Sequence, residues 1–269
     1  MSFLFNSPFN IGGGTQEWFP FAASAYDSAS LAIFAAFSTP PDTTRKGVID
    51  TCVRALKSAG VWTKLDVLYL FAAADSQAAL INWKNPGTYN ATATSSPTFT
   101  ADGGYTGNGS SSYVNSNFNP TTASSPNFTQ NSGCMFGRCL NNSNQAFPLW
   151  GDTGGFLSNF YPRNGSNLFQ GRINSASNVQ AASTDSSGHW VVNRSGASAQ
   201  ELYKNGSSVG SNAGASTSMQ NANLTALQTS SNFSTYQVAS WGIASSLSAT
   251  EAAALYAAEL AYMQAVGAA

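Results

Sequence analysis

The single histidine of the chain is the first residue to consider for chemistry. A serine nucleophile needs a histidine base that a carboxylate orients, and Asp185 stands four residues before His189. No Gly-x-Ser-x-Gly elbow accompanies them, and the run from Asp185 to His189 is typical of a turn that leads into a strand. We therefore expect no catalytic triad.

Paired carboxylates, the other common catalytic set, do not occur in the spacing that a sandwich fold needs. Glycoside hydrolases on such folds bring two or three carboxylates together, typically through an E-x-D-x-E strand, and the sequence has no such run. The pairs Asp42 with Asp50 and Glu251 with Glu259 fall in segments predicted as helices. We predict no catalytic residue and a chain that is not an enzyme.

A sugar-binding patch needs aromatic rings for the apolar faces of a sugar and polar groups for its hydroxyls. The run from 150 to 164 places both kinds of side chain on turns. The alternative is that its aromatic rings belong to the core. The predicted carbohydrate-binding residues are Trp150, Asp152, Tyr161, Arg163 and Asn164.

Ligands for a metal ion are few. The plausible oxygen donors for calcium are Asp102, Asn108, Asn119 and Asp152, and Asn108 stands where an acidic residue would bind more strongly. We expect no metal and no cofactor.

The three cysteines, Cys52, Cys134 and Cys139, lack the CxxC spacing or nearby histidine of a zinc site. We expect buried thiols. A disulfide between Cys134 and Cys139 across a hairpin is the alternative.

Charged residues make up only 9% of the chain, against about 25% in ordinary soluble domains. Neutral polar residues must therefore provide its solubility. The net charge of −1 does not favour binding to the negatively charged phosphates of a nucleic acid. No apolar run is long enough to insert into a membrane. The first ten residues lack the basic start and cleavage site of a secretory signal, so we expect synthesis and assembly in a cytoplasm.

Residues 1–41 are aromatic and lack clear periodicity, which predicts an N-terminal arm. A free segment of this composition would promote aggregation, so a partner or the chain's own domain must cover it. Docking on a neighbouring subunit and packing on its own domain are both open. The predicted anchoring residues are Phe3, Phe5, Phe9, Trp18 and Phe19.

Two helices are predicted outside the strand-rich region. Residues 42–60 begin at a capping Asp42 or Thr43, carry an apolar stripe and end at Gly60. Residues 247–269 begin with a capping box of Ser248 and Glu251. The C-terminal helix packs against the strands or the first helix, or alternatively joins symmetry-related copies.

Residues 61–246 contain short strands separated by turns, with no long helical pattern between them. The run 189–206 predicts an antiparallel hairpin followed by a type I′ turn at Asn205-Gly206. The fold class that follows is all-β, with two antiparallel sheets stacked as a sandwich.

Three segments resemble the laminin-G-like, concanavalin-A-like jelly roll. The hairpin carries W-x-x-N-R followed by L-Y-x-N-G, the run 103–120 is similar to the early strands of those domains, and 239–257 is similar to their end. The resemblance covers roughly 68–258. It implies a lectin-type jelly roll, to which the residue patterns above add the N-terminal arm and a helix at each end.

Residues 45–118 resemble tail-fibre-like structural proteins of tailed bacteriophages and prophages. The resemblance implies a virion structural protein, with a tail-fibre or tail-tip adhesin as the expected role. The expected partners are other virion proteins through the arm, a host-surface glycan, and further copies of the chain in a homo-oligomer. The alternatives are a capsid decoration or head-fibre protein without a specific ligand, and a jelly-roll carbohydrate hydrolase.

Overall fold

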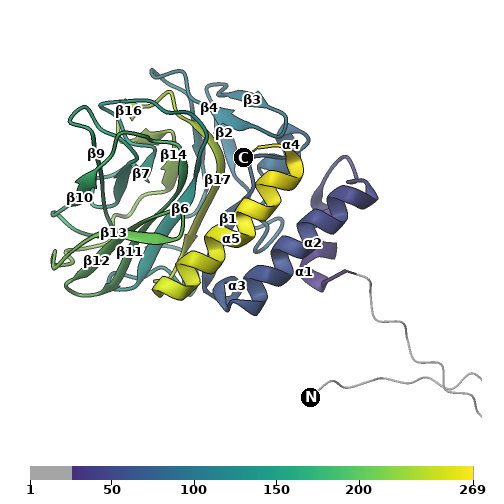
Figure 1. The fold of residues 1–269 in the computed structure, drawn as a ribbon, viewed down its shortest axis with the longest axis horizontal. Coiled ribbons are helices and arrows are strands. Elements are labelled where there is room, and N and C mark those ends of the chain that lie inside the picture. The colour runs from purple at the N-terminus through teal and green to yellow at the C-terminus, as the bar shows by residue number, and fades with distance from the viewer. Residues whose placement is uncertain (1–25, 269) are drawn as a thin grey trace, which may run out of the picture.

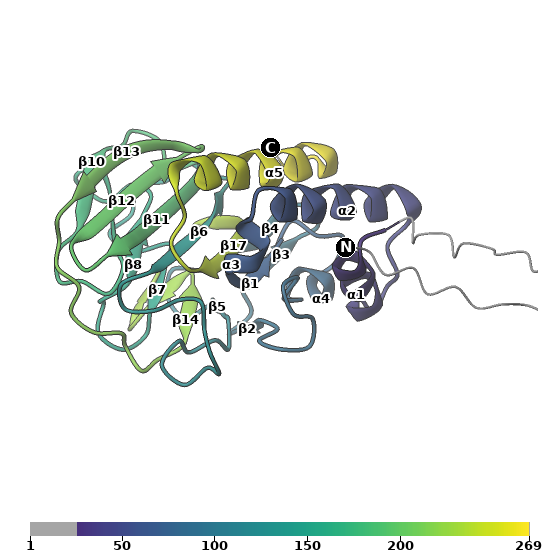
Figure 2. The same ribbon diagram turned by 90° about the horizontal axis from the view of Figure 1, so that it is seen from below.

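The computed structural model describes residues 26–268 and consists of two stacked antiparallel sheets with helices on one side (Figures 1 and 2). The predicted all-β sandwich is confirmed. No helix among the described residues is long and apolar enough to cross a membrane.

The larger sheet carries the longest strands, and β1 (Leu65–Tyr69) joins it by pairing with β17. In order across the sheet, its other strands are β13 (Ser207–Asn212), β12 (Ala199–Lys204), β11 (Gly188–Gly196), β6 (Gly133–Cys139), β17 (Gln237–Ala244), β4 (Gly104–Thr106) and β3 (Thr98–Thr100).

The smaller sheet is built from shorter strands. In order, these are β10 (Val179–Ala182), β9 (Leu168–Arg172), β8 (Asn159–Tyr161), β7 (Trp150–Asp152), β14 (Leu224–Ala226), β5 (Tyr113–Asn115) and β2 (Thr92–Thr94). A separate pair, β15 (Gln228–Thr229) and β16 (Asn232–Phe233), follows β14.

The larger sheet is buried on both faces. Along β6, Met135 and Cys139 point into the sandwich, whereas Cys134 and Phe136 point under the helices. Side chains on a strand alternate between its two faces, so this one strand contributes to both apolar layers. The predicted disulfide alternative is thereby contradicted, because Cys134 and Cys139 lie on opposite faces and both thiols are free.

Strand β1 alternates as predicted from Val67 onward. Val67, Tyr69 and Phe71 belong to the sandwich core. Leu65 belongs to the helical layer, the apolar cluster between the larger sheet and the helices. The register with β17 shifts between Leu65 and Val67, which turns Leu65 to the other face. The expectation that Leu65 shares their face was therefore wrong.

Both predicted helices form, and both caps are confirmed. Asp42 accepts a hydrogen bond from the Arg45 amide at the start of α2 (Thr43–Ser58), and Gly60 follows the end of that helix with φ 74°. The Ser248 and Glu251 capping box starts α5 (Ala249–Val266). Helices α2 and α5 lie side by side over the larger sheet (Figure 2).

The segment predicted as an arm contains a helix, α1 (Ser28–Ala36), in its described part. Ile33 and Phe34 of α1 are buried in the helical layer, and Asp27 forms an ion pair with Lys57 of α2 at 2.5 Å. Two further short helices are α3 (Val61–Lys64) and α4 (Ser76–Ala79). The five predicted anchoring residues, Phe3, Phe5, Phe9, Trp18 and Phe19, lie outside the described residues.

The predicted hairpin is confirmed. Strands β11 and β12 pair antiparallel, with Val191 opposite Tyr203 and Trp190 opposite Lys204. Asn205 and Gly206 both have positive φ, 49° and 79°, as a type I′ turn requires.

One test of the doubly buried sheet is Gly242→Ala. The new Cβ would lie 2.1 Å from Cζ of Phe136, a fully buried ring that has no room to move away. We expect a loss of about 1–3 kcal/mol in the free energy of unfolding, measured by urea titration.

The matched control is Gly47→Ala, because a Cβ at this glycine of α2 meets no atom within 4 Å. It should stabilise the protein by about 0.5–1 kcal/mol through helix propensity. Equal effects of the two substitutions would contradict the packing described for β17.

Candidate functional site

The predicted sugar-binding patch is not assembled in the structure. Trp150 is 0% exposed and stacks on Phe160 in the sandwich core, with ring centroids 4.8 Å apart. A buried ring cannot cover the face of a sugar, so the assignment of Trp150 to the site was wrong.

Asp152 is also buried, and it has a structural role. Its carboxylate accepts hydrogen bonds from the amides of Gly154, Gly155, Phe156 and Ser158. These bonds fold the β7–β8 loop back on itself, so the assignment of Asp152 to a sugar site was wrong as well.

The other three predicted residues lie nearer the surface but are not on one face. Tyr161 is half-buried on β8, opposite Gln170 of β9, and burial raises its pKa. Arg163 and Asn164 lie in the β8–β9 loop, where the Asn164 side chain accepts hydrogen bonds from the amides of Ser166 and Leu168. Arg163 and Asn164 thus lie in a loop beyond β8, apart from the core position of Trp150.

One cavity, here called the edge cleft, lies where the edges of the two sheets approach each other. It has a volume of about 300 Å³ and is formed by β9 and β10 of the smaller sheet with β12, β13 and the start of β11 of the larger sheet. Its lining residues are Phe169, Ala181, Ala182, Ser183, Thr184, Asp185, Trp190, Lys204 and Val209.

Lys204 and Trp190 form one wall of the edge cleft. The Lys204 ammonium lies over the Trp190 ring, 4.6 Å from its centroid, and donates a hydrogen bond of 2.8 Å to the backbone carbonyl of Asp185. Its Nζ is 3.9 Å from Oδ2 of Asp185. Burial lowers the pKa of Lys204, although the Asp185 carboxylate acts in the opposite direction.

Asp185 contributes the negative charge of the edge cleft. Partial burial acts to raise its pKa, but hydrogen bonds from the amide and hydroxyl of Ser187 outweigh this effect and hold the pKa below its usual range. Its side chain remains 45% exposed. The carboxylate is thus ionised and accessible.

A polar network connects the edge cleft with the predicted Arg163. The Asn142 side chain accepts a hydrogen bond from Nη1 of Arg163 at 3.1 Å and donates one to the carbonyl of Thr184 at 3.3 Å. Arg163 also donates to Oδ1 of Asn167 at 2.9 Å. Loops that follow β6, β8 and β10 are therefore held together at the mouth of the cleft.

The edge cleft combines groups that suit a polyhydroxylated ligand. It offers an ammonium donor, a carboxylate acceptor and small hydroxyl side chains, above the buried rings of Trp190 and Phe169. The hairpin register could have revealed part of this site, since it places Lys204 directly opposite Trp190. The contribution of β10 comes from the other sheet and has no local signal in the sequence.

His189 lies elsewhere, beneath α5. His189, Arg138 and Ser240 sit side by side on β11, β6 and β17, and Glu259 of α5 packs onto this row. Asp185 accepts hydrogen bonds from the amide and hydroxyl of Ser187, at a distance from the buried His189.

The row beneath α5 is fully buried at His189 and Glu259. The Ser240 hydroxyl donates to Oε2 of Glu259 at 2.5 Å, and Nε2 of His189 lies 3.6 Å from the same oxygen. Burial raises the pKa of Glu259 to about 7, while burial and the nearby Arg138 lower the pKa of His189 to about 3. At neutral pH the imidazole is uncharged, so this contact is not an ion pair.

The oxygens proposed for calcium are engaged with the protein. Asp102 binds Arg45 through both carboxylate oxygens, at 2.8 and 3.0 Å, and Asp152 is used by the β7–β8 loop. Within residues 26–268, no group of three or more His, Cys, Asp or Glu side chains could hold a metal ion.

No protein-family model and no curated protein matches the chain. Solved structures do match. The receptor-binding domain of botulinum neurotoxin D is similar with a TM-score of 0.50 and 11% identity, over 74% of this chain and 54% of that chain. A Trypanosoma rangeli sialidase in complex with sialic acid is similar with a TM-score of 0.50 and 10% identity, over 78% of this chain and 38% of that chain.

These likenesses are at the level of the fold, and this chain spans about half or less of the length of each structure. They contradict the prediction that the chain is not an enzyme, because a sialidase is among the proteins that share its sandwich. That prediction rested on one spacing of carboxylates along one strand, and folding can also bring carboxylates together from distant segments. The fold is shared by an enzyme and by a receptor-binding domain.

The buried Glu259 predicts a pH-dependent stability. Its pKa rises from an ordinary value of 4.5 to about 7 in the folded protein. A carboxyl group of this kind contributes stability that is complete below about pH 4.5 and is lost as the pH rises through 7. The difference amounts to about 3 kcal/mol across that range.

Glu259→Gln should remove this dependence, because the amide does not ionise. Urea unfolding of both proteins at pH 5 and pH 8 should show the original chain losing about 2–3 kcal/mol relative to the variant. His189 is present in both proteins, so its own titration cancels in the comparison. Parallel changes in the two proteins would contradict the burial of an ionisable Glu259.

Proposed function

We propose that the chain is a carbohydrate-binding β-sandwich protein and that its ligand binds in the edge cleft. The observation that carries the proposal is the meeting of the partly exposed Lys204 and Asp185 side chains with Thr184 at one cleft, over a floor of buried aromatic rings. The likeness of the fold to a receptor-binding domain and to a sialidase supports the same class of ligand.

The chemistry of the edge cleft supports a sugar more than a purely apolar ligand. Lys204 donates to ring or exocyclic hydroxyls, and the Asp185 carboxylate accepts from them. The Thr184 side chain adds a group that both donates and accepts. Loops from both sheets form the mouth of the edge cleft. The strands that precede these loops hold the site rigidly in place.

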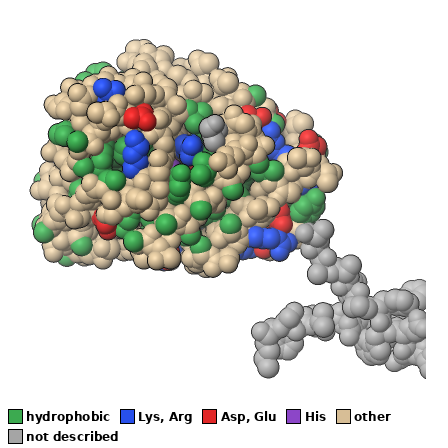
Figure 3. Space-filling model, viewed as in Figure 1, with side chains coloured by type: hydrophobic (Ala, Val, Ile, Leu, Met, Phe, Trp, Pro, Cys, Tyr) green, Lys and Arg blue, Asp and Glu red, His purple; other side chains and the backbone are tan. Residues whose placement is uncertain are grey.

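We also propose that binding serves attachment to a host cell, as in a tail-fibre or tail-tip adhesin. Support for a virion setting comes from the sequence resemblance of residues 45–118 and from the low share of charged residues, 9% of the chain, which leaves most of the face in Figure 3 to neutral side chains and backbone. A homo-oligomer would join weak sites into a strong attachment through avidity. Adhesins of this kind do not need tight binding at each site.

The test is binding of the full chain to a glycan array and to host envelope fractions, compared with Lys204→Met and Asp185→Asn. Both substitutions keep the size of the side chain and remove its charge. Loss of a charge-assisted hydrogen bond costs about 1.5–3 kcal/mol, so we expect affinity to fall roughly tenfold to a hundredfold.

Lys46→Met is the matched control, since Lys46 lies on α2 in the helical layer and should not affect binding. Unchanged affinity in both cleft variants, with normal unfolding curves, would rule out the edge cleft as the site. Absence of glycan binding by the assembled protein would instead favour the capsid decoration or head-fibre role.

A further inference from the structure

The mouth of the edge cleft opens onto a polar surface that continues beyond the lining residues. The side chain of Asn142 joins the Thr184 carbonyl to the Arg163 guanidinium. Past Arg163, the Asn144 side chain donates a hydrogen bond of 2.9 Å to Oδ1 of Asn167. The side chains of Asn142, Asn144 and Asn167 are exposed. These five residues, here called the polar track, lead from the cleft into the loop between β6 and β7.

The β6–β7 loop carries an exposed aromatic ring at the far end of the polar track. Phe147 is 39% exposed, and the only other large apolar side chain exposed within residues 26–268 is Leu31 of α1. The amide of Gln145 donates a hydrogen bond of 3.2 Å to the carbonyl of Arg163. Two residues of chain span at most about 7 Å, so Phe147 lies beside the track.

Phe147 is held in place on both sides along the chain. The Gln145 side chain accepts a hydrogen bond of 2.8 Å from the amide of Thr235. On the other side, Leu149 is fully buried in the sandwich core, and its amide donates to the carbonyl of Phe160 at 2.8 Å. A ring that is fixed before binding loses little conformational entropy when a ligand covers it.

The polar track and Phe147 together supply what the edge cleft lacks. An exposed ring packs on the apolar face of a sugar, while amide and guanidinium groups bond to its hydroxyls. The rings of Phe169 and Trp190 in the cleft are buried and cannot be covered in this way. A ligand confined to the cleft would therefore reach polar groups but no exposed ring.

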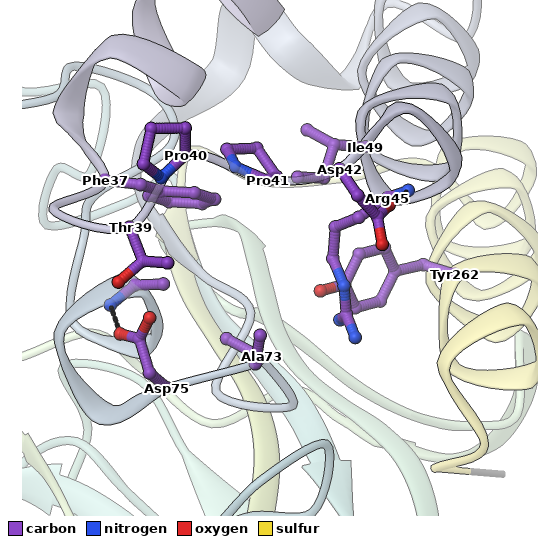
Figure 4. A pocket seen from close by; sticks show the side chains of 12 residues that line it. Phe37, Thr39, Pro40, Pro41, Asp42, Arg45, Ile49, Ala73, Asp75 and Tyr262 are labelled. Carbon is purple, nitrogen blue, oxygen red and sulfur yellow. Dashed lines mark hydrogen bonds between the residues drawn. The ribbon is translucent and has the colours of Figure 1, made fainter.

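The cavity beside α4 does not offer a comparable set of groups (Figure 4). It has a volume of about 280 Å³, but its Arg45 donates to both carboxylate oxygens of Asp102, at 2.8 and 3.0 Å. Its Asp75 accepts a hydrogen bond of 2.8 Å from the amide of Ala78. By contrast, Nη2 of Arg163 has no acceptor among the residues that the structure describes, so it remains available to a ligand.

We propose that the ligand is an oligosaccharide that extends from the edge cleft along the polar track and places a sugar ring on Phe147. This inference rests on the proposed function, because it names the class of sugar that the same site binds. Phe147 and Arg163 then determine specificity for a chain of sugars over a single sugar.

The test measures how affinity depends on the length of the glycan. The probes are single sugars, disaccharides and longer fragments, released by mild acid hydrolysis of the host-envelope polysaccharide and separated by size. In calorimetric titrations of the full chain, Phe147→Ala should lower the affinity for the longer fragments about tenfold and leave that for single sugars unchanged. Phe147→Tyr keeps the ring and should retain the affinity.

Leu31→Ala is the matched control, because it removes the other exposed large apolar side chain from a helix far along the chain from the track. It should change neither affinity. A second readout is the ¹⁹F resonance of 4-fluorophenylalanine at position 147. The resonance should shift when the longer fragments are added and stay unchanged with single sugars.

The outcomes separate this inference from the proposed function. If Lys204→Met weakens binding but Phe147→Ala binds the longer fragments as tightly as the original chain, the extended ligand is wrong and the edge cleft remains the site. Loss of binding in Phe147→Ala alone would overturn the edge cleft, and with it a ligand that spans both. No effect of either substitution, or no binding of any fragment by the original chain, would overturn both proposals.

Discussion

The structure depends on one constraint, which is that the larger sheet is buried on both faces. Strands β6, β11 and β17 send alternate side chains into the sandwich and under the helices. Neither face could be left in water without exposing a continuous apolar surface. The helices are therefore part of the same cooperative structure as the sandwich, and the close contact between Phe136 and Gly242 follows from this double burial.

The same constraint determines where a ligand has access. Helices α2 and α5 close the outer face of the larger sheet, so the loops and edges of the sandwich are the places where polar groups can meet solvent (Figure 2). The edge cleft lies at such a place, with residues from both sheets. His189 and Glu259 show the opposite situation, because both are buried beneath or on α5, and burial lowers the pKa of His189 and raises that of Glu259.

Local features were predictable from the sequence because their causes are local. The cap at Asp42, the capping box at Ser248 and the turn at Asn205 each depend on residues a few positions apart. Burial is not local. Trp150 stands next to polar turn residues, and only the pairing of β7 with β8 and β14 places it inside the core. The edge cleft was missed for the same reason, since Thr184 and Lys204 meet across two different sheets.

The pairing of β1 with β17 has a consequence for how the protein is made. Leu68 lies opposite Gly242, so roughly two-thirds of the chain separates two neighbouring strands. On a ribosome, β1 and α2 emerge long before β17 and α5, and their apolar faces have no native cover during that interval. Contacts of such long sequence separation form slowly. Completion of the fold therefore waits until β17 and α5 have been synthesised, and until then the apolar faces of β1 and α2 are open to aggregation.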